Sequence, residues 1–199
     1  MRIFRAGWTA VAGIIPLISN CECLAAEPKA WEKLTDCRYV PYAYNDGDSF
    51  RVKCGTDEFI VRLYFVDTPE TDTKDHERTQ EQTEYFGVTL ENNIQAGVQA
   101  RDAVDELLRT TPFVIWTRRA SAAGRSKEPR YYGLVEVGGK GLAEILVSKG
   151  LARTKGIRAN LPSGEKSKAY EEKLEELEHA AKEKRVGVWA HSRVQEGGP

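Results

Sequence analysis

Two acidic turns in the middle of the chain carry residues that could do phosphate and metal chemistry. The first is Asp-Gly-Asp-Ser at 46–49, and the second is Asp-Thr-Pro-Glu at 67–70. Arg62 lies between them in an otherwise apolar run, where a buried guanidinium is costly unless an anion meets it. Carboxylate oxygens suit Ca²⁺ or Mg²⁺, and a guanidinium can bind phosphate through two parallel hydrogen bonds. The pattern predicts carboxylates and a guanidinium that converge on one spot.

Each motif also has a structural interpretation when it is taken singly. Asp-Gly is common in tight turns, and Pro69 ends a strand because proline cannot extend a hydrogen-bonded ladder. A buried Arg62 can also pair with a carboxylate inside the protein. The combination favours a functional site, while burial alone leaves an internal Arg–Asp pair open.

The strands that would position these residues are visible as alternating or continuous apolar side chains. Turn residues at 45–47 and 55–57 separate the first three of them. We expect five strands, over residues 38–44, 49–54, 58–66, 113–117 and 131–137.

Helical periodicity begins after the third strand. Ala100, Val104 and Leu108 fall on one face of a helix, and a polar loop from Thr71 to about Glu84 is expected before it. A short helix over 142–148 and a final helix are also expected, the latter marked by Tyr170, Leu174, Leu177 and Ala181. This order suggests an α+β, mainly β, fold: a five-stranded OB-fold barrel with about three packed helices.

The first residues differ from the rest of the chain. Arg2 and Arg5 precede an apolar stretch at 6–18, and small residues follow at Ala25-Ala26, which is the pattern of a secretory signal peptide. The stretch is shorter than the roughly 20 apolar residues of an ordinary membrane-spanning helix. A buried N-terminal helix or an uncleaved signal anchor is the alternative. We expect a secreted or periplasmic protein without stable membrane insertion after cleavage.

The length of 199 residues suits one domain with a short appendage. We expect a signal peptide at 1–26, a linker at 27–36, an OB-fold domain at 37–191 and a flexible tail at 192–199. Loss of the signal peptide would change the formal charge from −1 to −2, because two arginines and one glutamate leave with it. That balance argues against a polyanion clamp driven by total charge, and it permits a local basic surface.

Cys37 and Cys54 would remain after cleavage. An even number of cysteines in an oxidising compartment is compatible with a disulfide, and two free buried thiols are the alternative. The sequence contains no C-x-x-C pair with zinc spacing. His76, His179 and His191 do not form a cluster in the sequence, so a histidine-bound metal has no support.

The two acidic motifs together resemble the paired signature of the staphylococcal nuclease (thermonuclease) family. In that family the first motif is Asp-Gly-Asp-Thr and the second is Arg-Leu-x-x-Val/Ile-Asp-x-Pro-Glu. Here they read Asp-Gly-Asp-Ser at 46–49 and Arg-Leu-Tyr-Phe-Val-Asp-Thr-Pro-Glu at 62–70. The similarity continues through residues 139–152 and ends with the helix and tryptophan at 184–189. It therefore covers about residues 38–190.

The resemblance implies a role for each matching residue. Asp48 and Asp67 would ligate one Ca²⁺ ion, helped by the backbone carbonyl of Thr68. Glu70 matches the proposed general base, and Arg62 matches the first of two arginines that hold the phosphate. The resemblance also implies cleavage of the 5′ P–O bond in DNA and RNA, which leaves 3′-phosphate ends. We expect a monomer that acts preferentially on single strands.

This sequence departs from the family at the second arginine. The family usually has Tyr-Gly-Arg just before the last predicted strand, and ungapped alignment puts Tyr132 at the arginine position. Arg125 reproduces the Gly-Arg dipeptide, and Arg130 lies two residues before Tyr132, hence on the same strand face. Both candidates stay open. The long loop at 71–87 is a second departure.

Three tyrosines are candidates for substrate binding, and core packing is their alternative use. They are Tyr85, Tyr131 and Tyr132.

A catalytically weak or inactive OB-fold module that binds nucleic acid is the competing interpretation. The four signature residues to which the resemblance assigns a side-chain role are all present, which favours the enzyme: Asp48, Arg62, Asp67 and Glu70. The unplaced second arginine keeps the alternative open, because losing one charge-stabilising group can cost roughly 10²–10³ in rate.

Overall fold

The computed structural model describes residues 29–122 and 128–193. The predicted signal peptide at 1–26, the last six residues of the predicted tail and Arg125 lie outside these ranges. Within them, no helix combines the length and the apolar character that crossing a membrane requires.

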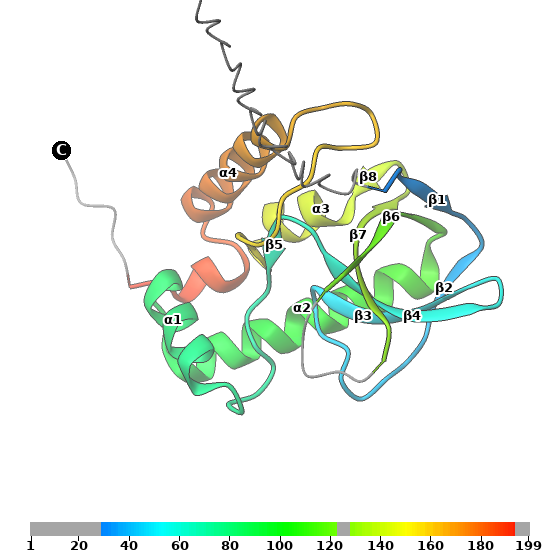
Figure 1. The fold of residues 1–199 in the computed structure, drawn as a ribbon. Helices are drawn as coiled ribbons and strands as arrows, with labels where there is room; N and C mark the ends of the chain where they lie inside the picture. Colours follow the sequence, from blue (N-terminus) through cyan, green and yellow to red (C-terminus); the bar gives the residue numbers. More distant parts are fainter. Residues whose placement is uncertain (1–28, 123–127, 194–199) are drawn as a thin grey trace, which may run out of the picture.

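A bent sheet forms the centre of the fold (Figure 1). Its strands are β1 Glu32–Leu34, β2 Cys37–Tyr39, β3 Ser49–Cys54, β4 Asp57–Leu63, β6 Phe113–Ser121, β7 Arg130–Val137 and β8 Lys140–Gly141. The hydrogen-bonded order is β1-β6-β7-β4-β3-β2, and β8 pairs with β7. Neighbouring strands run antiparallel except for β4 and β7, which are parallel.

The two ends of this sheet, β1 and β2, do not pair with each other in the residues that the structure describes. They are consecutive strands of three residues each, and Asp36 between them turns the chain with a φ of 53°. A closed five-stranded barrel is therefore not confirmed. The structure supports an α+β fold whose sheet stays open. Strand β1 also lies inside the segment 27–36 that we expected to be a linker, and it pairs with β6.

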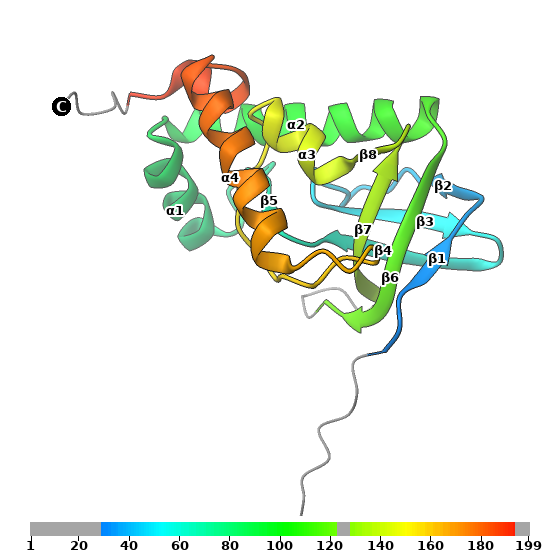
Figure 2. The same cartoon turned by 90° about the horizontal axis from the view of Figure 1, so that it is seen from above.

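The helices of the described ranges cover the sheet from one side and one end. They are α1 His76–Phe86, α2 Leu90–Thr110, α3 Leu142–Ser148 and α4 Ser167–Glu183, followed by the 3₁₀ helix η1 Gly187–His191. Figure 2 shows α2 running along the sheet, with α1 and α4 gathered at the end away from β1 and β2. The described ranges thus contain four α-helices, whereas the sequence predicted about three.

Helix α1 occupies the segment that we expected to be a loop. Asp75 caps its start by accepting a hydrogen bond from the backbone N–H of Arg78, and Gly87 ends it in the left-handed conformation. Its buried residues are Thr79, Gln82 and Phe86. Because two of these three are polar, hydrophobic periodicity did not reveal the helix.

Strand β4 separates the core from the candidate site. Its core-facing side chains, each at most 3% exposed, are Phe59, Val61 and Leu63. Arg62 alternates with them and therefore lies on the other face of the strand. The predicted period of two is confirmed here.

The chain leaves the main sheet just after β4. Phe65 has a φ of 69°, which interrupts the extended backbone. Strand β5, Val66–Asp67, then pairs antiparallel with β9, Arg153–Thr154. This separate pairing places Asp67 opposite Arg153.

A disulfide bond joins Cys37 and Cys54, whose strands β2 and β3 place them directly opposite each other. It closes a separation of 17 residues and ties the short edge strand β2 to the rest of the sheet.

Candidate active site

Arg62 connects the two acidic motifs. Its Nη1 atom donates to Asp48 Oδ1, and its Nη2 atom lies 3.2 Å from Asp67 Oδ1. The side chains of Asp48 and Asp67 are 1% and 7% exposed. The register between β3 and β4 explains the meeting, because it pairs Ser49, the residue after Asp48, with Arg62. The structure therefore brings these three predicted site residues together.

The first motif is a tight turn held by its first aspartate. Asp46 Oδ1 accepts hydrogen bonds from the backbone N–H groups of Asp48 at 3.0 Å and Ser49 at 2.6 Å. Burial and the neighbouring Asp48 carboxylate raise the pKa of Asp46 above its ordinary value. Gly47 has no room for a side chain, since a Cβ there would lie 2.8 Å from Thr68 Cγ2. This turn places Asp48 next to Thr68, whose backbone N–H donates a hydrogen bond to Asp48 Oδ2 at 2.9 Å.

Gln82 on α1 shapes the second motif, and sequence reasoning missed it. Its Nε2 atom donates to Asp67 Oδ2 at 3.1 Å and to the carbonyl of Thr68 at 2.9 Å. Its Oε1 atom accepts from the backbone N–H of Glu70 at 2.8 Å. One fully buried amide thus fixes three residues of the turn.

Helix α2 presses against the same turn. A Cβ at Gly97 would lie 2.3 Å from the carbonyl oxygen of Glu70 and 2.6 Å from that of Pro69. Only glycine therefore allows this approach of helix backbone to turn backbone.

Two further arginines contact the acidic residues. Arg78, on α1, places Nε 2.7 Å from Glu70 Oε1, and its Nη2 donates to Asp67 Oδ1. Arg153 is fully buried and donates to Asp67 Oδ2 from Nε at 2.9 Å and Nη2 at 2.8 Å. Neither was predicted, because each reaches the site from an element whose approach depends on tertiary packing.

The carboxyl groups respond differently to this environment. Burial alone would raise the pKa of Asp67, but Arg78, Arg153 and Arg62 together hold it below its ordinary value. Burial raises the pKa of Glu70, with the Asp48 and Asp67 carboxylates adding to the increase and Arg78 opposing it. A raised pKa suits a carboxylate that takes up a proton, because proton transfer is most effective near the working pH.

The predicted residues on β7 divide between two faces. Arg130 and Tyr132 pair with Ile60 and Arg62 in the parallel register, so they share the face of Arg62. Arg130 Nε donates to Ser49 Oγ at 3.1 Å. Tyr132 stacks obliquely on Tyr64, with ring centroids 5.0 Å apart.

The structure does not bring Tyr131 or Tyr85 to the acidic residues. Tyr131 packs on Phe59 with ring centroids 5.6 Å apart, because strand alternation turns it to the face opposite Arg62. Tyr85 donates its hydroxyl hydrogen to Glu178 on α4, and its ring packs against Phe86. Both tyrosines serve packing in this structure.

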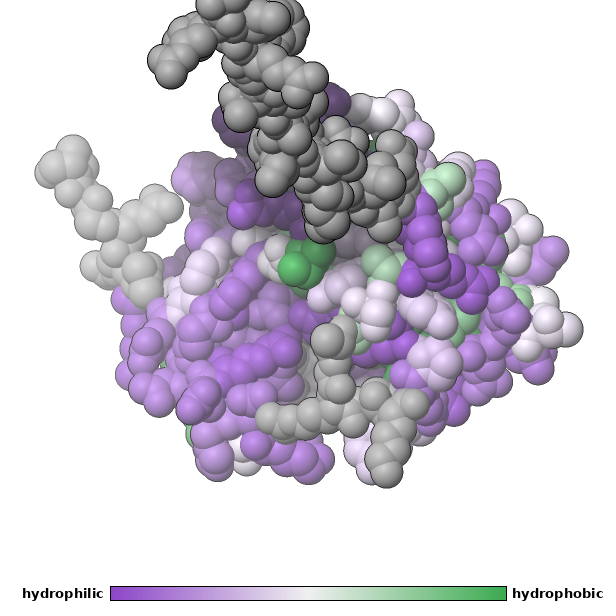
Figure 3. All heavy atoms as spheres, in the orientation of Figure 1, coloured by the Kyte–Doolittle hydropathy of each residue, from purple (hydrophilic) through white to green (hydrophobic). Residues whose placement is uncertain are grey.

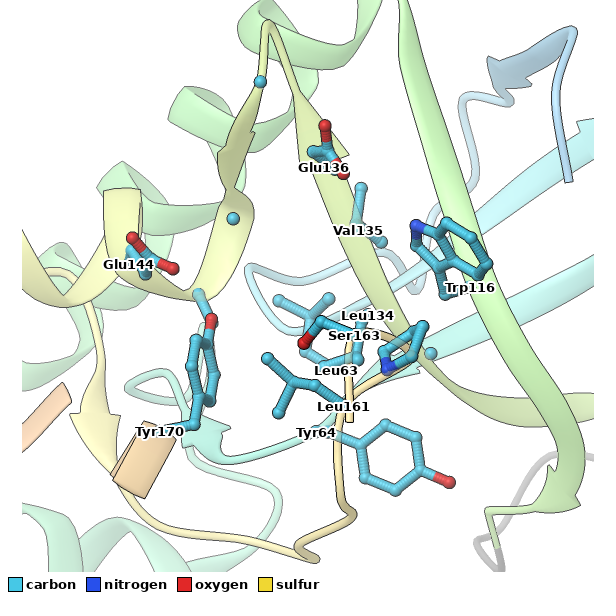
Figure 4. A pocket seen from close by; sticks show the side chains of 15 residues that line it. Leu63, Tyr64, Trp116, Leu134, Val135, Glu136, Glu144, Leu161, Ser163 and Tyr170 are labelled. Atoms are coloured by element: carbon cyan, nitrogen blue, oxygen red, sulfur yellow. The ribbon is translucent and has the colours of Figure 1, made fainter. Parts of the chain in front are cut away.

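A separate cavity of about 410 Å³ lies beside the sheet, and none of the acidic-site residues lines it. In Figure 4, Leu63, Leu134 and Leu161 gather between Tyr170 and Trp116. The charged site and this mainly apolar cavity are therefore two separate places in the structure. On the face of the molecule shown in Figure 3, most of the residues drawn in colour are hydrophilic.

The donor atoms at the acidic site are chemically suited to a hard cation. Among the described residues, no group of three or more His, Cys, Asp or Glu side chains is arranged to hold a metal ion. Two carboxylates, those of Asp48 and Asp67, already converge on the positive charge of Arg62. Ca²⁺ takes six to eight oxygen ligands, so backbone oxygen and water would have to complete its shell. Gln82 Nε2 donates to both Asp67 Oδ2 and the carbonyl of Thr68, so a backbone oxygen close to Asp67 is present for such a mixed set.

The fold and the site together define an α+β domain in which two acidic turns meet around one arginine. The family model described as "Staphylococcal nuclease homologue" matches residues 60–191. Since the match covers more than half of the chain, the protein belongs to this family. The matched range contains Arg62, Asp67 and Glu70, while Asp48 lies before it and joins the site through the fold. No curated protein matches the chain.

Proposed function

We propose that this protein is a calcium-dependent nuclease that hydrolyses phosphodiester bonds of DNA and RNA. The observation that carries the proposal is the convergence of Asp48 and Asp67 on Arg62, with Glu70 next to them. Family membership supports the nuclease activity, and the oxygen donors support the metal.

Asp48 and Asp67 would hold one Ca²⁺ ion, helped by the carbonyl of Thr68. Bound there, Ca²⁺ would withdraw charge from a phosphoryl oxygen and offset the negative charge of the transition state. Arg62 would turn its guanidinium to the phosphate, where a fork of N–H donors can bind two oxygens at once.

Glu70 would act as the general base. It takes a proton from a water molecule, whose oxygen then attacks phosphorus in line with the departing 5′ oxygen. The bond between phosphorus and the 5′ oxygen breaks, and that oxygen takes a proton from a solvent water molecule and leaves as a hydroxyl. The phosphate stays on the 3′ side of the cut.

We further propose that the protein is exported and acts as a monomer on single strands. The basic and apolar start of the sequence supports export, and the Cys37–Cys54 disulfide suits an oxidising compartment.

The test is digestion of end-labelled single-stranded DNA by the purified protein, in calcium and in a chelator. We expect cleavage in calcium alone and fragments that carry 3′-phosphate, detected by their failure to prime a polymerase until a phosphatase is added. Binding of DNA without cleavage would instead identify an inactive binding module. Fragments with 3′-hydroxyl ends would overturn the proposed bond.

A further inference from the structure

Helix α1 brings to the acidic site an arginine that lies outside the paired signature. Arg78 Nε is 2.7 Å from Glu70 Oε1, and Arg78 Nη2 donates to Asp67 and lies 3.9 Å from Asp48 Oδ2. Its guanidinium therefore approaches every acidic residue to which the proposed function assigns a role. We propose that Arg78 is the second phosphate-binding arginine of this site, an inference that rests on the proposed nuclease activity.

Exposure separates Arg78 from the other arginines around Asp67. The side chain of Arg153 is fully buried and that of Arg62 is 13% exposed, whereas that of Arg78 is 34% exposed. Arg153 also forms an ion pair with Glu81 and is committed to holding β9 against α1. Arg78 is thus the guanidinium that an incoming phosphate can reach from solvent while it still contacts the base.

A rigid element carries Arg78. Residues three and four positions apart share one helix face, and α1 turns Arg78, Glu81 and Gln82 to the site. Glu81 pairs with Arg153 at 2.8 Å, and Gln82 is held by the 67–70 turn. The helix is therefore fixed at two points next to Arg78, which gives its guanidinium a defined position.

A bound cation could replace Arg78 as the positive partner of the acidic residues. Arg78 and a bound cation would both be attracted to the oxygens of Asp67 and Asp48. With a divalent cation there, these carboxylates no longer need the guanidinium, and Arg78 can turn to phosphate oxygens beside Glu70. Removing Arg78 should therefore weaken phosphate binding without weakening calcium binding.

Arg130 is the competing candidate. It lies on β7 on the same sheet face as Arg62, and its Nε donates to Ser49 Oγ. Arg62 and Arg130 thus occupy one wall of the site, whereas Arg78 approaches from a different element and contacts the base itself. We expect Arg130 to contribute less to phosphate binding than Arg78.

Arg78 could instead act only as a clamp that holds α1 on the turn. A clamp would stabilise the fold and leave the affinity for phosphate unchanged. The two roles therefore differ in a binding measurement that involves no catalysis.

The test is calorimetric binding of thymidine 3′-phosphate to the purified protein in calcium. This probe carries the phosphate of the proposed product and has no diester to cleave. The variants are Arg78→Gln, Arg78→Lys, Arg130→Gln and, as a partly exposed control on α2, Arg101→Gln. Calcium affinity, melting temperature and turnover on single-stranded DNA are measured on the same samples.

We expect Arg78→Gln to weaken probe binding by about 10- to 100-fold, the usual range for a lost hydrogen bond to a charged group. Turnover should fall by roughly 10²–10³-fold, and added methylguanidinium should restore part of it. If Arg78→Gln does not fold, Arg78→Lys serves in its place, since it keeps the charge and loses the two-pronged fork. It should then weaken probe binding while calcium affinity stays at the wild-type value.

Probe affinity that equals wild type in the folded Arg78 variants would overturn the assignment of Arg78. So would a larger loss in Arg130→Gln than in Arg78→Gln. These results leave the nuclease proposal intact, provided that the wild-type protein cleaves DNA in calcium. A wild-type protein that neither binds the probe nor cleaves DNA would overturn both proposals.

Discussion

Asp67 accepts hydrogen bonds from four side chains, those of Arg62, Arg78, Arg153 and Gln82. Its carboxylate is almost fully buried, so its negative charge balances the guanidinium groups of Arg62 and Arg153, which have little access to water. The residue therefore belongs to the stability of the fold as well as to the proposed chemistry. Removing one member of a buried ionic network leaves the others without compensation.

Asp67→Asn keeps the shape of the side chain and removes its charge. We expect the free energy of unfolding to fall by about 3–5 kcal/mol, because Arg153 would lose its main buried counter-charge. Urea denaturation in a chelator measures this effect without any contribution from metal.

The control for that experiment is Asp102→Asn, since Asp102 is 62% exposed on α2. It should change the free energy of unfolding by no more than about 0.5 kcal/mol. Equal losses in the two variants would contradict the structural role of Asp67.

At the residue scale, the sequence predicted the acidic residues of the site and missed the side chains that hold them in place. Asp48, Arg62, Asp67 and Glu70 could be predicted because two short motifs contain them. Arg78, Gln82 and Arg153 could not be assigned in this way. Their contacts depend on how α1 and β9 pack, and a polar residue in an expected loop gives no sign of burial. A basic residue eight positions after Glu70 was the available hint.

At the element scale, strands with a clean period of two were the most predictable. The strand predicted at 49–54 is confirmed as β3 with the same bounds, and that at 131–137 begins one residue earlier as β7. The strand expected at 38–44 shortened to β2, Cys37–Tyr39. Helix α1 was missed since its buried face is mainly polar, so packing rather than apolar periodicity reveals it.

Helix α2 acts on the site through a single glycine. Gly97→Ala would place a methyl group against the backbone of Glu70, where neither partner can move cheaply. We expect the free energy of unfolding to fall by about 1–3 kcal/mol from overpacking, although alanine normally favours a helix. Chemical denaturation measures the change.

Gln99→Ala provides the matched control, because Gln99 is an exposed residue of the same helix. It should leave the stability unchanged or slightly higher, in line with the helix propensity of alanine. A stabilising effect of Gly97→Ala would show that α2 does not press on the turn as described.

At the scale of the whole molecule, the class of fold could be predicted and its closure could not. The succession of strands and helices along the chain was inferred from local patterns, whereas closing a barrel depends on pairing between its two edge strands. Here β1 pairs with β6 and β2 pairs with β3, and the described residues show no pairing between β1 and β2. The resemblance to the family depended on the two motifs and not on that closure, and the family model that matches residues 60–191 confirms it.

The disulfide links the fold to the proposed oxidising location. Replacing both cysteines, Cys37→Ser with Cys54→Ser, frees a segment of 17 residues in the unfolded chain. We expect the double variant to lose about 3 kcal/mol of stability, mainly through the entropy of the unfolded state. Wild-type protein melted with and without a reductant provides the comparison. A melting temperature that does not respond to the reductant would contradict a stabilising bond.

The central claim is that one hard cation, Arg62 and Glu70 act on the same phosphate. The most direct test is a calcium titration of single-stranded DNA cleavage by the wild-type protein and by Glu70→Gln. The account predicts saturable activation by calcium in the wild type, a similar calcium midpoint in the variant and a turnover lower by about 10²–10⁴-fold. Cleavage that persists in a chelator, or a Glu70→Gln variant with wild-type turnover, would contradict it.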